Sequence, residues 1–148
     1  MTHTSAGTLF TDLVLEIFRL NGALLDEGDR LTSDLGLTSS RWQVMGAISE
    51  RPLPVPHIAN EMGLTRQGVQ KIANTLKREG LVDLQNNPHH KSSKLVSLTP
   101  EGRKRLAAID KIQSKWAEEI AAEHGAGELS DAHRIIHQLR VNLERKTS

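Results

Sequence analysis

Cysteine is absent from this chain of 148 residues, and only 3% of the residues are aromatic. The absence of thiols excludes disulfides, thiolate metal sites, thiol catalysis and thiol redox sensing together. Long uncharged apolar runs are also absent, which excludes a membrane-spanning helix. The N-terminal segment lacks the basic leader, apolar block and small-residue cleavage site of a secretory signal. We therefore expect a cytoplasmic protein whose length suits one globular domain.

Motifs that position catalytic groups are missing as well. The sequence contains no glycine-rich phosphate loop, no serine elbow and no HExxH pattern, and its carboxylates recur at spacings typical of solvated helix faces. We therefore predict that the protein is not an enzyme, has no catalytic residues and uses no cofactor.

Charge is distributed unevenly along a chain whose formal net charge is only +1. Residues 51–105 contain ten Lys or Arg and four Asp or Glu, a net charge of +6, whereas the other residues contain nine and fourteen, a net charge of −5. A basic module between acidic flanks indicates a polyanionic partner for the middle of the chain only. The alternative is ordinary surface charge that happens to cluster.

Hydrophobic periodicity predicts a mainly helical chain. Over residues 9–35 the apolar side chains recur at intervals of three and four, the spacing of one helical face, although Gly22 and Gly28 weaken this helix. The "GLT" at 36–38 supplies a glycine stop and a threonine N-cap for a second helix. The prolines of "RPLPVP", residues 51–56, predict a connector and cannot be helix interior.

A β-hairpin is predicted in the second half of the basic module. "GLVDLQ" and "KLVSLT" alternate apolar and polar residues as strands do, and the turn-rich "NNPHHKSS" between them indicates a long loop. "TPEG" then starts another helix, with Thr99 as N-cap, Pro100 in the first helical position and Glu101 near the positive helix end. The predicted fold class is therefore mainly α with a small β-hairpin.

The last predicted helix has a narrow apolar stripe. Its members recur at steps of three and four: Leu129, Ala132, Ile136, Leu139 and Leu143. Such a stripe suits packing against another helix. Together with the long N-terminal helix, it suggests that the two ends of the chain jointly form a dimer interface.

The most specific signal is "PHIANEMGLTRQGVQKIANTLKREGLV", which begins at Pro56. A DNA-reading helix-turn-helix needs a small residue where two helices cross, a glycine in the tight turn, and apolar residues that lock the second helix in place. Ala59 and Gly63 meet the first two requirements. The third is met by Ile58, Met62, Leu64, Val69, Ile72 and Leu76.

The residues left facing outward on the second helix are basic or carry amides: Arg66, Gln67, Gln70, Lys71, Asn74, Lys77 and Arg78. Arginine and glutamine near the start of a recognition helix can form bidentate contacts with guanine and adenine edges. Lysines further along are better placed for phosphates. The alternative is a solvated face in a helical bundle.

Three segments resemble, in order and spacing, the MarR family of winged helix-turn-helix transcriptional regulators: "LGLTSSRWQVMGAI", "IANEMGLTRQGVQKIANTLKREGLV" and "KLVSLTPEGRKRL". The resemblance implies a homodimer bound to a palindromic operator in double-stranded DNA. It implies that residues 1–37 and 106–148 form the dimerisation region and that residues 38–105 form the winged helix-turn-helix DNA-binding domain, with a wing at 83–99. The groove-facing positions that it implies are Thr65, Arg66, Gln67, Gln70 and Lys71, with Asn74 and Lys77 beyond them.

The wing departs from the family pattern, in which an aspartate braces an arginine that enters the minor groove. Here "PHHKSSK" places His90 at the acidic position and Lys91 and Ser92 where arginines are expected. Lysine is a flexible point charge, not a planar fork, so we predict weak minor-groove selectivity and mainly phosphate contacts. The predicted wing contacts are His89, His90, Lys91 and Lys94.

The resemblance also implies a cavity for a small-molecule effector between the dimerisation region and the DNA-binding lobes. A repressor that a ligand releases from DNA is therefore expected. The candidate lining residues are Phe18, Leu20, Trp42 and Met45. Apolar residues at helical spacing are generally buried, so core packing is the favoured interpretation of these four residues.

Two alternatives come from other classes of function. His133 and His137 have the i, i+4 spacing that places two imidazoles on one helix face, which would suit a metal-responsive regulator with Glu123 or His124 as a third ligand. Helical histidine pairs without a fixed third ligand are usually surface residues, so we predict no metal site. The other alternative is a winged-helix protein-interaction module without DNA readout, against which the outward basic helix argues.

Overall fold

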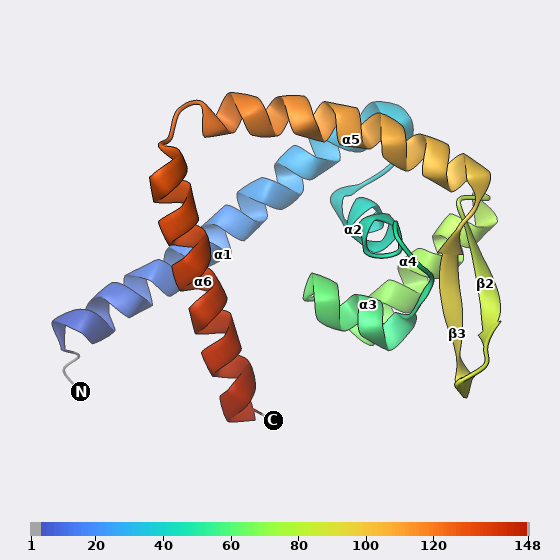
Figure 1. The fold of residues 1–148 in the computed structure, drawn as a ribbon, viewed down its shortest axis with the longest axis horizontal. Helices are drawn as coiled ribbons and strands as arrows, with labels where there is room; N and C mark the ends of the chain where they lie inside the picture. Colours follow the sequence, from blue (N-terminus) through green and yellow to red (C-terminus); the bar gives the residue numbers. More distant parts are fainter. Residues whose placement is uncertain (1–3, 148) are drawn as a thin grey trace. The chain divides into compact units, whose positions relative to one another are not determined.

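The computed structural model describes residues 4–147, most of which are helical. Its elements, in order, are α1 (Ser5–Thr32), η1 (Ser33–Leu35), α2 (Ser39–Ala47), β1 (Leu53–Pro54), α3 (Val55–Met62), α4 (Arg66–Arg78), β2 (Val82–Asn87), β3 (His90–Leu98), α5 (Pro100–Ala121) and α6 (Ala126–Thr147). The prediction of a mainly α fold with a small hairpin is confirmed (Figure 1). The chain forms two compact units, one up to Asp110 and one from Lys111 onward.

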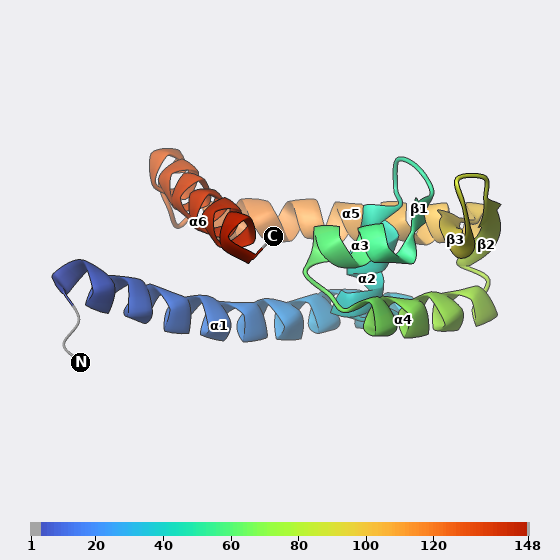
Figure 2. The same ribbon diagram turned by 90° about the horizontal axis from the view of Figure 1, so that it is seen from below.

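The first unit begins with α1, which Figure 2 shows as one continuous helix. The helix ends at Thr32, and the single 3₁₀ turn η1 leads to Gly36, whose φ of 69° is left-handed and suits glycine. The Thr38 hydroxyl accepts a hydrogen bond from the Arg41 N–H at 3.2 Å and so caps α2. The glycine stop and threonine cap predicted at 36–38 are therefore confirmed.

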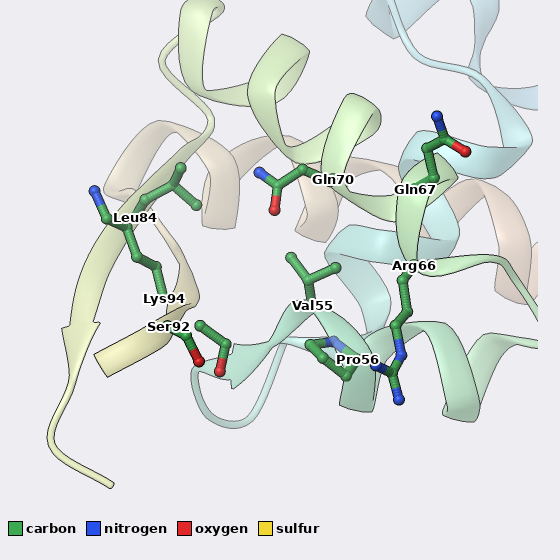
Figure 3. Close-up of a pocket in the computed structure, with 9 residues that line it drawn as sticks. Val55, Pro56, Arg66, Gln67, Gln70, Leu84, Ser92 and Lys94 are labelled. Carbon is green, nitrogen blue, oxygen red and sulfur yellow. The ribbon is translucent and has the colours of Figure 1, made fainter. Parts of the chain in front are cut away.

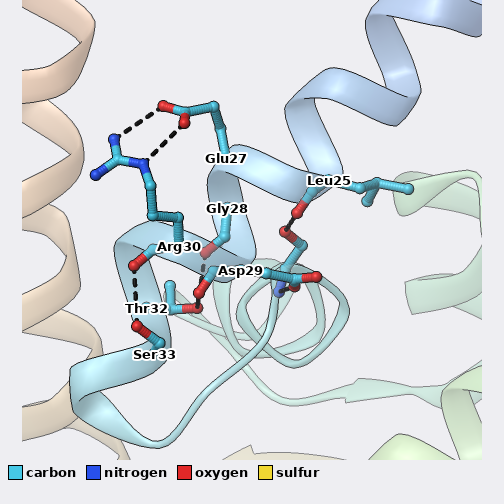
Figure 4. Close-up of polar contacts among 8 residues, drawn as sticks. Leu25, Glu27, Gly28, Asp29, Arg30, Thr32 and Ser33 are labelled. Carbon is cyan, nitrogen blue, oxygen red and sulfur yellow. Dashed lines mark hydrogen bonds and ion pairs between the residues drawn. The ribbon is translucent and has the colours of Figure 1, made fainter.

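Hydrogen bonds fasten the end of α1 to the start of α2 (Figure 4). The Ser39 N–H donates to Asp29 Oδ1 at 2.8 Å, and the Ser39 hydroxyl donates to the Leu25 carbonyl at 2.5 Å. The buried Thr32 hydroxyl donates to the Gly28 carbonyl at 2.7 Å. Gly28 permits this close approach, because a Cβ at that position would lie 2.0 Å from Ser39 Oγ.

The helix-turn-helix consists of α3 and α4, joined by a tight turn. Gly63 ends α3 with a φ of 66°, and the Thr65 hydroxyl accepts the Gly68 N–H at 3.0 Å to start α4. The prolines of residues 51–56 lie outside helix interiors, as predicted. The segment is not a plain connector, however, because Pro56 lies in the first turn of α3, where the missing N–H costs no helical hydrogen bond.

A three-stranded antiparallel sheet in the order β1-β3-β2 contains the wing. Strand β1 pairs with β3 through Leu53 opposite Val96, and β2 continues along β3 until Asn87 pairs with His90. The prediction of a long loop at "NNPHHKSS" is wrong, since most of this stretch is paired strand and only two residues connect β2 to β3. The backbone hydrogen bonds of the hairpin satisfy groups that a loop would leave to water.

The hydrophobic core of the first unit draws on every element around the helix-turn-helix: Leu37, Val44, Met45, Ile48, Leu53, Val55, Ile58, Ala59, Val69, Ala73, Leu76, Leu81, Val82, Val96, Leu98, Leu106 and Ile109. The predicted apolar lock of the second helix is confirmed, with Val69 and Leu76 fully buried and Leu64 and Ile72 packed against the core. This core fixes which face of α4 points outward.

Helix α5 starts as predicted. The Thr99 hydroxyl accepts the Gly102 N–H at 3.0 Å, and Pro100 occupies the first helical position. The same hydroxyl donates to the Gly80 carbonyl at 2.7 Å, which ties the start of α5 to the end of α4. The helix therefore begins directly against the wing.

The second unit contains the distal part of α5 and the whole of α6. No described residue of α6 is buried, and its predicted stripe is largely exposed, with Leu129 and Ile136 each 43% exposed and Leu143 55% exposed. The dimer interface therefore stays a prediction. None of the helices in residues 4–147 is long and apolar enough to cross a membrane.

Candidate nucleic-acid interface

Helix α4 has one buried face and one exposed face. Val69, Ala73 and Leu76 are fully buried, which places the other side of the helix in solvent. All predicted groove-facing residues of the helix are exposed: Arg66, Gln67, Gln70, Lys71, Asn74 and Lys77. The first turn has no acidic residue, so the positive end of the helix dipole is not neutralised there.

Two predicted contact residues have partners within the helix. Gln70 Nε2 donates to Asn74 Oδ1 at 3.0 Å, which orients the Gln70 amide while leaving its carbonyl oxygen and second N–H available. The Thr65 hydroxyl is an acceptor in its cap, and an accepting hydroxyl keeps its own O–H as a donor. Both side chains can therefore still contact DNA.

The acidic residue that follows α4 is paired. Glu79 Oε1 lies 3.2 Å from Arg41 Nη1 of α2, and the Arg41 side chain is partly buried whereas that of Glu79 is exposed. The pair draws the carboxylate toward α2, beside the basic last turn of α4 with Lys77 and Arg78. The outward face of α4 therefore keeps its positive charge.

The tip of the wing presents every predicted wing contact to solvent: His89, His90, Lys91 and Lys94 are exposed. Asn87 Oδ1 accepts the His89 N–H at 3.0 Å and shapes the turn. The pairing of β2 with β3 is irregular between Gln85 and Asn87, so Lys91 and Lys94 belong to a bulged part of β3.

A groove of about 570 Å³ lies between α4 and the wing (Figure 3). Figure 3 shows Gln70 facing Leu84 across this groove, whereas the guanidinium of Arg66 lies beside Pro56. Its lining residues are Val55, Pro56, Arg66, Gln67, Gln70, Leu84, Ser92, Ser93 and Lys94. The groove thus brings together three predicted helix contacts and one predicted wing contact, while Lys71, Asn74, Lys77, His89 and Lys91 lie outside it.

A second groove, also of about 570 Å³, lies between α3 and β3 and shares Arg66 with the first. It is lined by Pro54, Pro56, His57, Asn60, Arg66, His90, Ser92 and Ser93. For His57 the sequence favours solvent or a phosphate over a metal as its surroundings, whereas it assigns Asn60 and Ser93 to no site. No local pattern marks the groove, because α3 and β3 are far apart in the sequence and the pairing of β1 with β3 helps to bring them together.

The four candidate effector residues divide into two pairs. Met45 is fully buried and Trp42 packs against the core, so the core interpretation is confirmed for these two. On α1, Phe18 is 68% exposed and Leu20 is 51% exposed, so that interpretation is wrong for them within a single chain. An exposed apolar helix face indicates a surface that a partner or a ligand covers.

His133 and His137 stack with ring centroids 6.3 Å apart, as their spacing predicts. His137 Nδ1 lies 3.5 Å from Arg140 Nη2, a cation that opposes metal binding at that nitrogen. Among residues 4–147 no group of three or more His, Asp or Glu side chains is placed to hold a metal ion. Glu123 and His124 therefore do not complete a site with this pair.

Comparison with known proteins identifies this arrangement. The sequence model of the MarR family matches residues 35–91, from η1 to the wing. An uncharacterized protein of Mycobacterium tuberculosis (strain ATCC 25618 / H37Rv) is 44% identical over 97 residues, which cover 66% of this chain and 68% of that protein. The chain belongs to the MarR family. This MarR family chain is therefore a DNA-binding transcriptional regulator with a winged helix-turn-helix.

Two further proteins resemble this MarR family chain over most of its length. The transcriptional activatory protein BadR of Rhodopseudomonas palustris (strain ATCC BAA-98 / CGA009) is 26% identical over 139 residues, 89% of this chain and 77% of BadR. The structure of reduced AbfR bound to DNA has a TM-score of 0.78 at 15% identity and covers 98% of this chain and 100% of that chain. The AbfR similarity confirms the fold.

Proposed function

We propose that this MarR family chain binds a palindromic operator as a homodimer and represses transcription until a small molecule releases it. The observation that carries the proposal is the groove between α4 and the wing, where Arg66 and Gln70 of the helix lie across from Lys94 of β3. An α-helix fits the major groove of B-DNA, and cations beside it suit the flanking phosphates.

In this proposal the N-terminal half of α4 reads base edges through Thr65, Arg66, Gln67, Gln70 and Lys71. Arginine suits guanine and glutamine suits adenine, because each can form two hydrogen bonds with the major-groove edge of that base. The phosphate contacts come from Asn74, Lys77, His89, His90, Lys91 and Lys94. The wing adds little sequence information, because lysine is a point charge without the planar fork of arginine.

A homodimer would cover the apolar side chains that α1 and α6 expose. Large apolar side chains on both helices are at least 41% exposed: Leu9, Phe10, Leu15, Phe18, Leu20, Leu24, Leu129, Ile135, Ile136 and Leu143. Monomeric proteins rarely leave so much apolar surface uncovered. We propose residues 1–37 and 106–148 as the dimerisation region. Two recognition helices would then enter successive major grooves about 34 Å apart.

DNA binding is tested by a mobility shift with an operator and with random DNA. Arg66→Ala combined with Gln70→Ala should abolish the preference for the operator, since both proposed base contacts of α4 are lost. Arg134→Ala with Gln138→Ala is the matched control, because these exposed residues of α6 have the same types and the same spacing. A preference left untouched by the α4 substitutions would show that other residues read the sequence.

The proposed effector acts by population shift. A ligand that prefers a spacing of the recognition helices unsuited to DNA would lower operator affinity by favouring that state. Phe18 and Leu20, which are exposed in the single chain, are the candidate contacts. A thermal-shift and DNA-release screen should find compounds that stabilise the protein and dissociate the complex. If the screen finds no such compound, the protein is a regulator that ligands do not release from DNA.

The direction of regulation needs its own measurement, because BadR bears the name of an activator. A reporter gene downstream of the operator should be less active when the protein is present. Higher reporter activity would overturn repression while leaving DNA binding intact.

Two other functions would give different experimental results. A metal-responsive regulator would lose a bound metal ion on chelation, which the metal content of the purified protein would reveal, but the cation of Arg140 beside His137 Nδ1 argues against this function. A protein-interaction module would show no DNA affinity at moderate salt and would bind a defined protein instead.

A further inference from the structure

The groove between α3 and β3 collects hydrogen-bond donors from three elements. His57 and Asn60 come from α3, Arg66 comes from α4, and β3 contributes side chains on its edge: His90, Ser92 and Ser93. None of the lining residues is acidic. A phosphate group offers several strong acceptor oxygens and a negative charge, which suits a concave surface of donors around one permanent cation.

We propose that this groove binds one phosphate of the DNA backbone and that His57 takes up a proton when the phosphate enters. The site would lie beside the base-reading residues of α4, and it rests on the proposed binding of operator DNA. Arg66 belongs to both grooves, so a phosphate held here would also fix the position of the guanidinium.

The proton uptake follows from the partner of His57. His57 Nε2 lies 3.1 Å from Glu61 Oε1 on the same helix. An ionised carboxylate only accepts hydrogen bonds, so Nε2 must carry the donated hydrogen. A neutral His57 then has only the acceptor Nδ1 left, which cannot hydrogen-bond a phosphate oxygen. The protonated imidazole has a second N–H at Nδ1 and bridges the carboxylate and the phosphate.

The charged and titratable groups around His57 agree with this role. They are Glu61 on its own helix, Arg66 on α4 and His90 on β3. Arg66 draws the phosphate into the groove, and Glu61 repels it unless His57 is protonated. His90 has an N–H donor even when neutral. Histidine side chains generally change charge between about pH 5 and 8, so DNA binding should be strongest at the acid end of that range.

The pH dependence of DNA affinity provides the first test. Fluorescence anisotropy at constant ionic strength should show the affinity of the wild type falling from pH 6 to pH 8, by up to about tenfold per pH unit for each proton taken up. His57→Gln should flatten this dependence and weaken binding at pH 6 by about tenfold, the effect of one hydrogen bond to a charged group. His124→Gln, an exposed histidine outside the groove, should leave the profile unchanged.

The variant Glu61→Gln separates the proposed role from a structural one. A neutral amide can donate to His57 Nε2, so the unprotonated imidazole can present its N–H to the phosphate through Nδ1. The variant should therefore bind DNA more tightly than the wild type at pH 8 and depend less on pH. A loss of affinity that is equal at pH 6 and pH 8 would contradict the bridge.

The phosphate itself is identified by replacing each backbone phosphate of the operator with an uncharged methylphosphonate. For the wild type, a methylphosphonate at one position in each half-site should lower the affinity, because it replaces the phosphate bound in the groove. His57→Gln and Asn60→Ala should bind DNA modified at that position as tightly as they bind unmodified DNA. Both variants should keep the losses at every other contacted phosphate. If both variants lose affinity at the same positions as the wild type, the groove binds no phosphate, although the protein still binds the operator. If the wild type binds no DNA at all, the proposed function fails instead.

Discussion

Gly102 lies where the first turn of α5 meets the backbone of Leu81. A Cβ at this position would lie 2.1 Å from the Leu81 carbonyl oxygen, and a backbone atom cannot move aside as a flexible side chain can. The neighbouring Thr99 uses its hydroxyl on both sides, accepting the Gly102 N–H and donating to the Gly80 carbonyl. The residue after "TPE" must therefore be glycine for reasons of packing, whereas the cap needs only its backbone N–H.

Gly102→Ala should lower the free energy of unfolding by about 1–3 kcal/mol, the usual cost of forcing extra atoms into a packed site. Gly46→Ala is the matched control, because a Cβ on that α2 residue meets nothing within 4 Å. The control should be neutral or stabilising by up to about 1 kcal/mol, since alanine favours helix. Urea denaturation at a fixed protein concentration measures both variants. Equal stabilities would show that α5 shifts without cost.

Among the helices and strands, those of the wing differ most from what the sequence predicts. Its strands continue to Asn87 and resume at His90, and the pairing of these two residues closes a turn of two residues where a long loop was predicted. Lys91 and Lys94 lie in the part of β3 where its pairing with β2 is irregular. Only Lys94 lines the groove beside α4. A hairpin lying against a DNA backbone could therefore use both lysines as point charges.

Lys91→Ala combined with Lys94→Ala should weaken binding to operator and random DNA by the same factor. The plot of log affinity against log salt concentration should become flatter by about 3.6, because each phosphate contact contributes about 0.9 to the slope and the homodimer loses four of them. Lys111→Ala with Lys115→Ala removes two exposed lysines of α5 as a control and should leave the slope unchanged. A loss confined to the operator would mean that the wing reads sequence.

The whole molecule depends on surfaces that a single chain leaves uncovered. No described residue of α6 is buried, and α1 buries only Gly28 and Thr32, both near its end. Apolar side chains on these helices stabilise nothing until another surface removes them from water. We therefore expect that formation of the proposed homodimer stabilises the chain and sets the spacing at which it contacts the operator.

Ile136→Glu combined with Leu143→Glu should convert the protein to monomers, because two carboxylates would be buried without partners in the interface. Sedimentation measures the mass directly. Operator affinity should fall together with the mass, since a monomer contacts only one half-site. Gln138→Glu with Asn142→Glu adds the same charge to exposed polar positions of α6 and should leave the mass at that of two chains. A double variant that keeps the mass of the wild type would place the interface elsewhere.

Much of the DNA-reading helix was predictable because its determinants are local. Gly63 takes the left-handed φ that a tight turn needs, and the steps of four and three from Val69 through Ala73 to Leu76 fix which side of α4 is buried. The caps at Thr38 and Thr99 follow from neighbouring residues for the same reason. The segment "NNPHHKSS", in contrast, suggested a long loop, whereas the structure has a turn of only Pro88 and His89 with a strand on either side.

The sequence alone determined the order of helices, the turn of the helix-turn-helix and the polar face of α4, since each depends on residues within a few positions of one another. Tertiary structure alone decided that α3 and β3 form a groove, because the pairing of Leu53 with Val96 joins segments far apart in the chain. It alone also decided that Phe18 is exposed and Met45 buried, although both occupy apolar positions at helical spacing. Periodicity shows that a face is apolar, but only packing determines what covers it.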